Sequence, residues 1–441
     1  MPQKQSNTYT NSPLIRLLAP LSLILLCPPF AMLLWYANVH LDGSYTELVQ
    51  WIAKVGLFEA IGQVWLPVFF GTTTAWKIIG LFAATQLILM RVLPGKKYHG
   101  PLTPMGNTPE YTDNGLLAYI ISLAAFFGLS YGAGLFNAGI VYDHFGEILG
   151  ALNVSALFFC LFLYFKGRFW PSSTDNGTSG NPIFDYYWGT ELYPRILGWD
   201  VKMFTNCRFG MIGWSLAVLS FAAAQQEQYG YLSPAIAVSA GLQAIYLFKF
   251  FVWEAGYMRS MDIIVDRAGF YIVWGCLVWV PSLYTAHTLY MVDHHEFLSW
   301  GMAALVMVLG LLAIWINYQA DVQRQRVRAT NGQCTVWGKK PELIRASYTT
   351  DTGEPKESIL LVSGWWGVSR HFHYIPELTV AFLWCFPAGF DSILPYSYFI
   401  FLCILLTHRS IRDDRKCAAK YGVYWDEYCK RVAYKIIPGV F

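Results

Sequence analysis

Long apolar runs separated by short polar segments dominate this chain. A bilayer core needs about 20 apolar residues per helix, and such runs recur along most of the sequence. We therefore predict an all-α, polytopic integral membrane protein with about ten transmembrane helices. The predicted helices are Leu14–Ala37, Thr74–Leu93, Gly115–Phe136, Ile148–Phe165, Phe209–Ala224, Ala235–Trp253, Gly269–Leu289, Phe297–Tyr318, Leu378–Ile393 and Tyr396–Thr407.

The predicted helices form a single membrane domain, residues 1–441. It consists of a polar tail (1–13), helices one to eight (14–320) and a C-terminal part with the last two helices (321–441). An amphipathic stretch, Leu48–Phe70, is expected to be interfacial or re-entrant. There is no internal repeat of the kind on which many transporters are built.

Composition supports the membrane class. The 441 residues are 55% hydrophobic and only 13% charged, whereas soluble domains carry roughly 25% charged residues. The formal net charge of +3 gives no indication of nucleic-acid binding. Because the polar segments Asp321–Ser358 and His408–Phe441 are both basic, both are expected on the cytosolic side.

The C-terminal segment has the densest polar pattern in the chain. Its cations stand beside aromatic residues at helical spacing, and a phosphorylated, ring-bearing ligand requires this combination. A basic membrane flank with an aromatic belt has the same residue types. Asp413 and Asp414 favour the ligand, because a pure flank has no use for carboxylates. The residues concerned are Arg409, Arg412, Arg415, Lys416, Lys420, Tyr421, Trp425 and Tyr428.

Two other segments add donors of the same kind. Arg324 and Arg328 are four residues apart, so they share a helix face if the eighth helix continues past the membrane surface. The segment Ser363–Tyr374 contains Trp366, Arg370, His371, His373 and Tyr374 between and after two glycines that permit close backbone approach. Interfacial snorkelling and a tight turn are the simpler interpretations, and a ligand pocket is favoured by the three segments together.

Several other sites are excluded or left open. No G-x-G-x-x-G follows a strand, and there is no P-loop or metal-ligand spacing; His294-His295 is an isolated pair. Tyr246, Lys249 and Glu254 lie in or near the sixth helix, where ionisable residues are costly and a function is the default hypothesis. For Tyr246, the residues alone favour an ordinary core or interface aromatic residue.

These residues resemble a known family over nearly the whole chain. The chain is similar to the sterol reductases of the delta-14 and delta-7 type, which include the sterol-reductase-like domain of the lamin B receptor. It is most similar to the delta-7 members, the 7-dehydrocholesterol reductases. The matching motifs are His408-Arg409 through Trp425 with the closing Ile-Pro-Gly, Leu361–Tyr374, Trp337–Pro341, Gly189–Arg195, Pro104–Asn107, Leu242–Tyr246 and Ile404–Arg409.

The resemblance implies an NADPH-dependent reduction of a sterol ring double bond. NADPH would bind in a cytosol-facing C-terminal pocket, and the sterol would enter from the bilayer lipid. Tyr246 would donate the proton, and Asp413 would orient it or relay a proton. The cofactor residues carried over by motif are Arg324, Arg328, Trp366, Arg370, Tyr374, Arg409, Arg412, Lys420, Tyr421, Trp425 and Tyr428. The membrane would be the endoplasmic reticulum in a eukaryote and the inner or cytoplasmic membrane in a bacterium.

The chain departs from the family pattern at four positions: Asp321, Arg324, Lys249 and His373. Arg324 replaces a lysine and keeps its charge, whereas Lys249 replaces a common acidic residue and His373 a common asparagine. The choice among delta-7, delta-14 and delta-24 double bonds therefore stays open, as does the oligomeric state.

Two other function classes remain in view. Arg370-His371 and the basic aromatic C-terminus also resemble the isoprenylcysteine methyltransferases, which use S-adenosylmethionine but lack the first eight helices. A non-catalytic sterol-binding scaffold would not require Arg412 and Asp413, and both are present.

Overall fold

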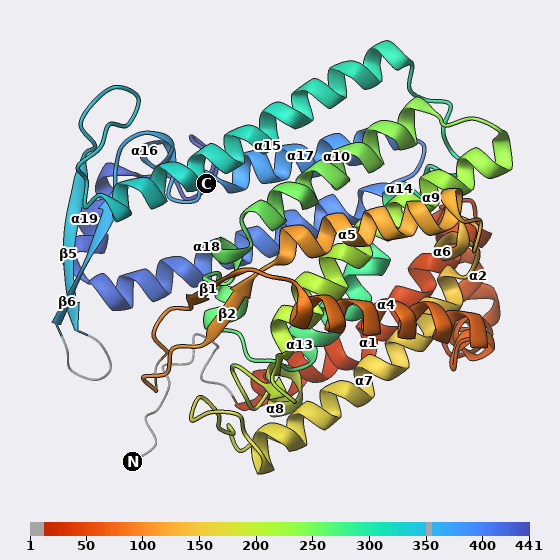
Figure 1. Ribbon diagram of the computed structural model, residues 1–441, viewed down its shortest axis with the longest axis horizontal. Coiled ribbons are helices and arrows are strands. Elements are labelled where there is room, and N and C mark those ends of the chain that lie inside the picture. The colour runs from red at the N-terminus through yellow and green to blue at the C-terminus, as the bar shows by residue number, and fades with distance from the viewer. Residues whose placement is uncertain (1–12, 104, 350–354) are drawn as a thin grey trace. The chain divides into compact units, whose positions relative to one another are not determined.

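The computed structural model describes residues 13–103, 105–349 and 355–441 and is built mainly of α-helices (Figure 1). Within these residues, nine helices are long and apolar enough to cross a membrane. The predicted all-α, polytopic fold is confirmed. The difference from about ten helices arises at Tyr374–Ala388, an apolar helical stretch shorter than the other nine. The predicted polar tail lies outside the described residues, apart from Pro13.

The described chain divides into two compact units. The large unit extends to Ala303 and also includes Phe386–Ser397. The C-terminal unit consists of Ala304–Cys385 and Tyr398–Phe441. This division differs from the proposed boundary at residue 321, because most of the eighth helix groups with the C-terminal residues.

The large unit contains most of the spanning segments. Its longer helices are α1 (Pro13–His40), α4 (Thr73–Val92), α5 (Gly115–Phe127), α7 (Phe145–Phe169), α9 (Ile212–Tyr229) and α10 (Pro234–Val252). Its shorter helices are α2 (Tyr45–Val55), α3 (Leu57–Trp65), α6 (Ile140–Asp143), α8 (Pro182–Trp188), α11 (Glu254–Tyr257), α12 (Met261–Ile264), α13 (Phe270–Trp274) and α14 (Ala286–Tyr290).

Irregular helices and short antiparallel strand pairs complete the large unit. The strands are β1 (Lys96–His99) with β2 (Glu110–Asp113), and β3 (Arg195–Ile196) with β4 (Trp199–Asp200). The π-helical segments are Gly128–Gly132, Met203–Met211 and Gly275–Tyr284, and the 3-10 turns are Leu66–Val68, Phe386–Ala388 and Leu394–Tyr396.

Buried amides bridge helices within the large unit. The Asn153 side chain on α7 donates to the Pro28 carbonyl of α1 at 2.9 Å and accepts from the Trp274 indole of α13 at 2.8 Å. Gln243 on α10 accepts from the Trp214 indole of α9 at 2.8 Å. Such hydrogen bonds stabilise helix packing where apolar contacts alone give little preference over lipid.

One ion pair in the large unit is completely buried. Arg208, on the π-helical segment before α9, forms two hydrogen bonds with the Glu254 carboxylate and donates to Asn114 Oδ1 at 2.8 Å. Arg208 and Glu254 are both 0% exposed. Gly115 lies against this carboxylate, since an added Cβ there would stand 2.3 Å from Glu254 Oε2. Together with Asn114, this ion pair links the segments at the starts of α5, α9 and α11.

Two predicted boundaries are corrected. The stretch Leu48–Phe70 is divided into α2 and α3 by Gly56, whose φ of +93° suits glycine. The last helix does not end at Thr407. It continues to Tyr421, because arginine, lysine and alanine are good helix formers even where the sequence becomes polar.

The C-terminal unit combines long helices with a β-hairpin. Its elements are α15 (Trp300–Ala329, in this unit from Ala304), β5 (Leu343–Thr349), β6 (Pro355–Leu361), α16 (Trp365–Val368), α17 (Tyr374–Cys385), α18 (Ser397–Tyr421, in this unit from Tyr398) and α19 (Val423–Arg431). The hairpin is antiparallel, with Leu343 opposite Leu361. Figure 1 shows α19 lying along the hairpin.

Candidate active site

The predicted site residues fall in both units. Tyr246 belongs to α10 of the large unit, whereas Asp413 and every predicted cofactor residue belong to the C-terminal unit.

Arg324 on α15 stacks on Trp366 of α16. The Arg324 guanidinium carbon lies 4.0 Å from the centre of the indole ring, and Arg324 also pairs with Asp321 at 3.2 Å. The Trp366 indole donates to the Ala320 carbonyl at 2.7 Å. Because α15 is continuous to Ala329, Arg324 and Arg328 share one helical segment, as predicted. Two of the unusual residues, Asp321 and Arg324, therefore form a pair of their own.

The glycine before Trp365 is required by this packing. Gly364 has a φ of +66°, and an added Cβ would lie 2.3 Å from Gln323 Oε1. That oxygen accepts from the Trp365 backbone N–H at 2.9 Å, so it holds the start of α16 against α15.

Gly364→Ala is expected to displace α16; if the cofactor predicted from the sequence, NADPH, binds in this unit, its affinity should fall by at least about tenfold, because the indole that stacks on Arg324 would move. Gly338→Ala is a matched control: Gly338 also has a positive φ of +77°, but its Cβ would meet nothing within 4 Å. Equal loss of NADPH affinity in the two variants, measured by fluorescence titration, would contradict this interpretation.

Arg370 clamps the C-terminal segment. Its guanidinium donates to the carbonyls of Val432 and Ala433, at 2.7 and 3.0 Å. Arg370 Nε also lies 3.5 Å from Asp414 Oδ1, and Lys435 lies 3.4 Å from the other oxygen of that carboxylate. Asp414 is thus held by two fixed cations and fastens the C-terminal segment to α18.

Asp413, the next residue along α18, has different neighbours. Its Oδ2 lies 3.9 Å from His371 Nε2 and accepts from the Cys417 thiol at 3.8 Å. The His371 ring stacks on Tyr374, with 5.2 Å between ring centres and 8° between planes. Adjacent aspartates therefore face opposite chemistries: Asp414 meets fixed charges, and Asp413 meets an imidazole and a thiol.

Burial lowers the pKa of the His371 imidazole below its usual 6.5. Asp413 raises this pKa, Arg324 and Arg370 lower it, and Asp414 raises it, in that order of size. The imidazole is therefore mainly neutral at pH 7.

The aromatic residues after α18 pack into the core of the C-terminal unit. Tyr421, Trp425 and Tyr428 are all less than 10% exposed, and they contact the hairpin at Ile344 and Leu360. Burial raises the pKa of the Tyr428 hydroxyl, against the opposing effect of nearby Arg324 and Arg370. These rings therefore form part of the apolar core of the C-terminal unit, and their direct contact with a cofactor stays a prediction.

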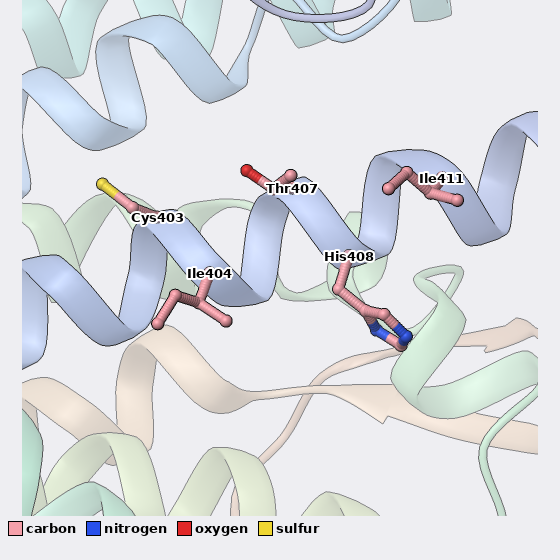
Figure 2. A pocket seen from close by; sticks show the side chains of 5 residues that line it. All are labelled: Cys403, Ile404, Thr407, His408 and Ile411. Atoms are coloured by element: carbon pink, nitrogen blue, oxygen red, sulfur yellow. The ribbon is translucent and has the colours of Figure 1, made fainter.

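Lys420 and two arginines complete the basic set. Lys420 Nζ lies 4.0 Å from the centre of the Tyr348 ring on β5. Arg409 and Arg412 lie on α18, with Arg412 only 5% exposed. Just before them, Cys403, Ile404, Thr407, His408 and Ile411 line a hollow on α18 (Figure 2). In Figure 2, Ile404 and His408 project from the same side of the helix.

The C-terminal unit has donors that suit a phosphorylated dinucleotide. Among the described residues, Ser369 Oγ, Arg370 Nε and His371 Nε2 are buried atoms without a hydrogen-bond partner. They lie in one short segment next to the Arg324–Trp366 stack. Guanidinium groups and a hydroxyl are donors that phosphate and ribose oxygens accept, so Arg370 and Ser369 fit NADPH, whereas His371 Nε2 lies 3.9 Å from Asp413 Oδ2.

Tyr246 is half-buried in the large unit. Its ring lies 6.2 Å from that of Trp214 and 5.6 Å from Lys249 Nζ. The unusual Lys249 therefore stands one helical turn from the predicted proton donor, on the same side of α10.

Sequence reasoning did not assign a role to His371, Asp414 or Lys435. Arg370 and His371 belong to the donor-rich segment Ser363–Tyr374, which together with the two other basic segments favoured a ligand pocket. His371 and Asp413 are 42 positions apart, Asp414 and Arg370 are 44 apart, and Lys435 and Asp414 are 21 apart, so none of these pairs gave a local signal.

Comparisons with known proteins agree on one family. Residues 23–441 match the model described as the ergosterol biosynthesis ERG4/ERG24 family. A 7-dehydrocholesterol reductase of Arabidopsis thaliana is 50% identical over 432 residues, 98% of this chain and 99% of that protein. A 7-dehydrocholesterol reductase of Xenopus laevis is 38% identical over 84% of this chain and 81% of its own length.

A delta(14)-sterol reductase of Methylotuvimicrobium alcaliphilum is 35% identical over 96% of this chain and 94% of its own length. The family model covers nearly all of the sequence, and all three relatives are at least 35% identical over at least 84% of this chain. This chain is a polytopic membrane protein that belongs to the ERG4/ERG24 family of sterol reductases.

Proposed function

We propose that this protein reduces the delta-7 double bond of a sterol with NADPH. The observation that carries the proposal is the 50% identity to a 7-dehydrocholesterol reductase across almost the full length of both chains. The delta(14)-sterol reductase, matched over a similar length, is 35% identical. A delta-14 or delta-24 specificity is the alternative, and a non-catalytic sterol-binding scaffold is the alternative of another class.

An unactivated carbon–carbon double bond is a poor base, so the site must supply a well-placed acid. Tyr246 is the proposed donor, and Asp413 orients it or relays the proton. NADPH, when bound, supplies the hydride that completes the reduction. Lys249, 5.6 Å from the Tyr246 ring, favours negative charge on the hydroxyl after its proton has left.

The C-terminal unit holds the cofactor in this proposal. Arg324, Arg328, Arg409, Arg412 and Lys420 supply cations for the phosphates, including the 2′-phosphate that distinguishes NADPH from NADH. The remaining predicted residues shape the pocket from its turn and its aromatic core; they are Trp366, Arg370, Tyr374, Tyr421, Trp425 and Tyr428.

Arg324→Gln is expected to raise the Kd for NADPH by about 10- to 100-fold, since it removes a charge-assisted contact. Arg326→Gln is the matched control, because Arg326 is exposed on the same helix and its replacement removes the same formal charge. Competition titrations with NADPH and NADH should show the loss for Arg324→Gln only. An equal loss of NADPH affinity in both variants would show that the effect depends only on net charge and would contradict the specific role of Arg324.

The proposed specificity is tested with purified protein in detergent. Delta-7, delta-14 and delta-24 sterols are offered separately with NADPH or NADH, and the products are identified by mass spectrometry. Reduction of 7-dehydrocholesterol with NADPH is the expected result. Reduction of another sterol instead would contradict the delta-7 specificity and support one of the alternative specificities. Sterol binding without turnover would favour the non-catalytic scaffold.

The substrate's chemistry also sets the proposed surroundings. A sterol partitions into lipid, so the substrate reaches the protein from the bilayer. The corresponding membrane is the endoplasmic reticulum in a eukaryotic cell and the cytoplasmic membrane in a bacterium.

A further inference from the structure

We propose that His371 is a positioning residue that returns a proton to Asp413 after each turnover. The inference rests on the proposed function, because a proton is needed there only if Asp413 serves the reduction. The step breaks the N–H bond at His371 Nε2 and forms an O–H bond at Asp413 Oδ2. The imidazole then takes another proton from water, so each turnover consumes one solvent proton.

The side chains of Asp413 and Asp414 have different neighbours. Asp414 is held by Arg370 at 3.5 Å and Lys435 at 3.4 Å, both of which carry a fixed charge. Asp413 Oδ2 is approached instead by His371 Nε2 at 3.9 Å. A shortening of about 1 Å would bring this pair within hydrogen-bond distance.

His371 has an unused donor position. Its Nε2 is buried without a hydrogen-bond partner among the described residues, and the whole residue is 5% exposed. A buried polar atom without a hydrogen-bond partner costs free energy of folding, so native proteins retain such an atom where it serves a function. Its backbone N–H is fixed by the Lys435 carbonyl at 2.8 Å, and its ring by the stack on Tyr374. The ring is held in place while one polar edge points toward Asp413.

The charges around the imidazole suit a carrier. Burial, Arg324 and Arg370 lower the pKa of His371, whereas Asp413 and Asp414 raise it, and burial is the largest effect. Its protonated form is therefore a stronger acid than a free imidazolium. Tyr374 and His373 also pack against the ring, with 5.2 and 6.2 Å between ring centres.

Kinetics test the proposal through the pH profile. Because only the protonated imidazole can deliver, wild-type kcat should rise as the pH falls from about 8 to about 6. His371→Gln should lower kcat at pH 7 by about 10- to 100-fold, flatten that rise and leave the KM for NADPH within about twofold. His294→Gln, a loop histidine paired with Asp42, is the matched control and should keep the wild-type profile.

Nuclear magnetic resonance gives a readout independent of turnover. In protein labelled with ¹⁵N-histidine, the signal lost in His371→Gln identifies this imidazole. Asp413→Asn should lower its titration midpoint, because a carboxylate that stabilises the imidazolium is removed.

The outcomes separate the two proposals. No sterol turnover by the wild-type protein would refute the proposed function, while the titration would still show whether His371 and Asp413 are coupled. An unchanged midpoint in Asp413→Asn would overturn the His371 inference. So would a His371→Gln protein with normal kcat and pH profile, or one that loses NADPH affinity and kcat together.

Discussion

Asp413→Asn is expected to lower kcat for sterol reduction by about 10²- to 10⁴-fold, the range typical of a lost acid–base group. An amide has nearly the shape of the carboxyl group but neither releases nor accepts a proton at neutral pH. Asp413 contacts His371 and Cys417, and neither of these side chains carries a fixed positive charge. Among these contacts, the substitution therefore breaks no ion pair with a lysine or an arginine. The Kd for NADPH should therefore stay within about twofold.

Asp414→Asn is the matched control for that result. This carboxylate binds Arg370 and Lys435, so its loss should loosen the C-terminal segment and weaken NADPH binding more than it lowers kcat. Steady-state kinetics and equilibrium binding on both variants separate the two effects. Equal profiles for the two variants would remove the distinct role assigned to Asp413.

Glu254→Ala is expected to destabilise the large unit by about 3–5 kcal/mol, because it leaves the Arg208 charge buried without its carboxylate. Arg208 is 0% exposed and would retain its 2.8 Å hydrogen bond to Asn114, which carries no charge. Thermal unfolding in detergent, followed by intrinsic tryptophan fluorescence or size-exclusion chromatography, measures the change.

An exposed pair provides the control. Glu110 pairs with Lys97 at 2.7 Å on β2 and β1, but its side chain is 45% exposed, so Glu110→Ala should leave the unfolding temperature almost unchanged. Replacing both buried charges, as Arg208→Met with Glu254→Leu, should recover part of the loss. A Glu254→Ala protein as stable as Glu110→Ala would contradict the role assigned to the buried pair.

The helices could be predicted from the sequence because the bilayer requirement is strong and local. Every predicted spanning helix except the ninth corresponds to a spanning helix in the structure, because each follows a long apolar run. The errors arose where a helix continues into polar residues. The final helix continues through Arg409, Arg412 and Lys420, since those residues favour a helix as readily as an apolar residue does. The π-helical segment around Arg208 has no sequence pattern of its own.

The site was predictable in composition and less so in arrangement. Cations and rings in three segments indicated a ligand, and the structure places the predicted cofactor residues in one unit. The clamp by Arg370 on Val432 and the approach of His371 to Asp413 depend on tertiary packing across distant positions. Periodicity reports one helix face at a time and cannot show which distant residue will meet it.

The most direct measurement of the central claim is a competition with deuterium-labelled cofactor. Purified protein receives NADPH deuterated at the transferred position and equal amounts of delta-7, delta-14 and delta-24 sterols, and products are separated and weighed by mass spectrometry. The account predicts that the delta-7 sterol is consumed first and gains one deuterium and one hydrogen from water. Preferential reduction of another sterol, or a product without deuterium, would contradict it.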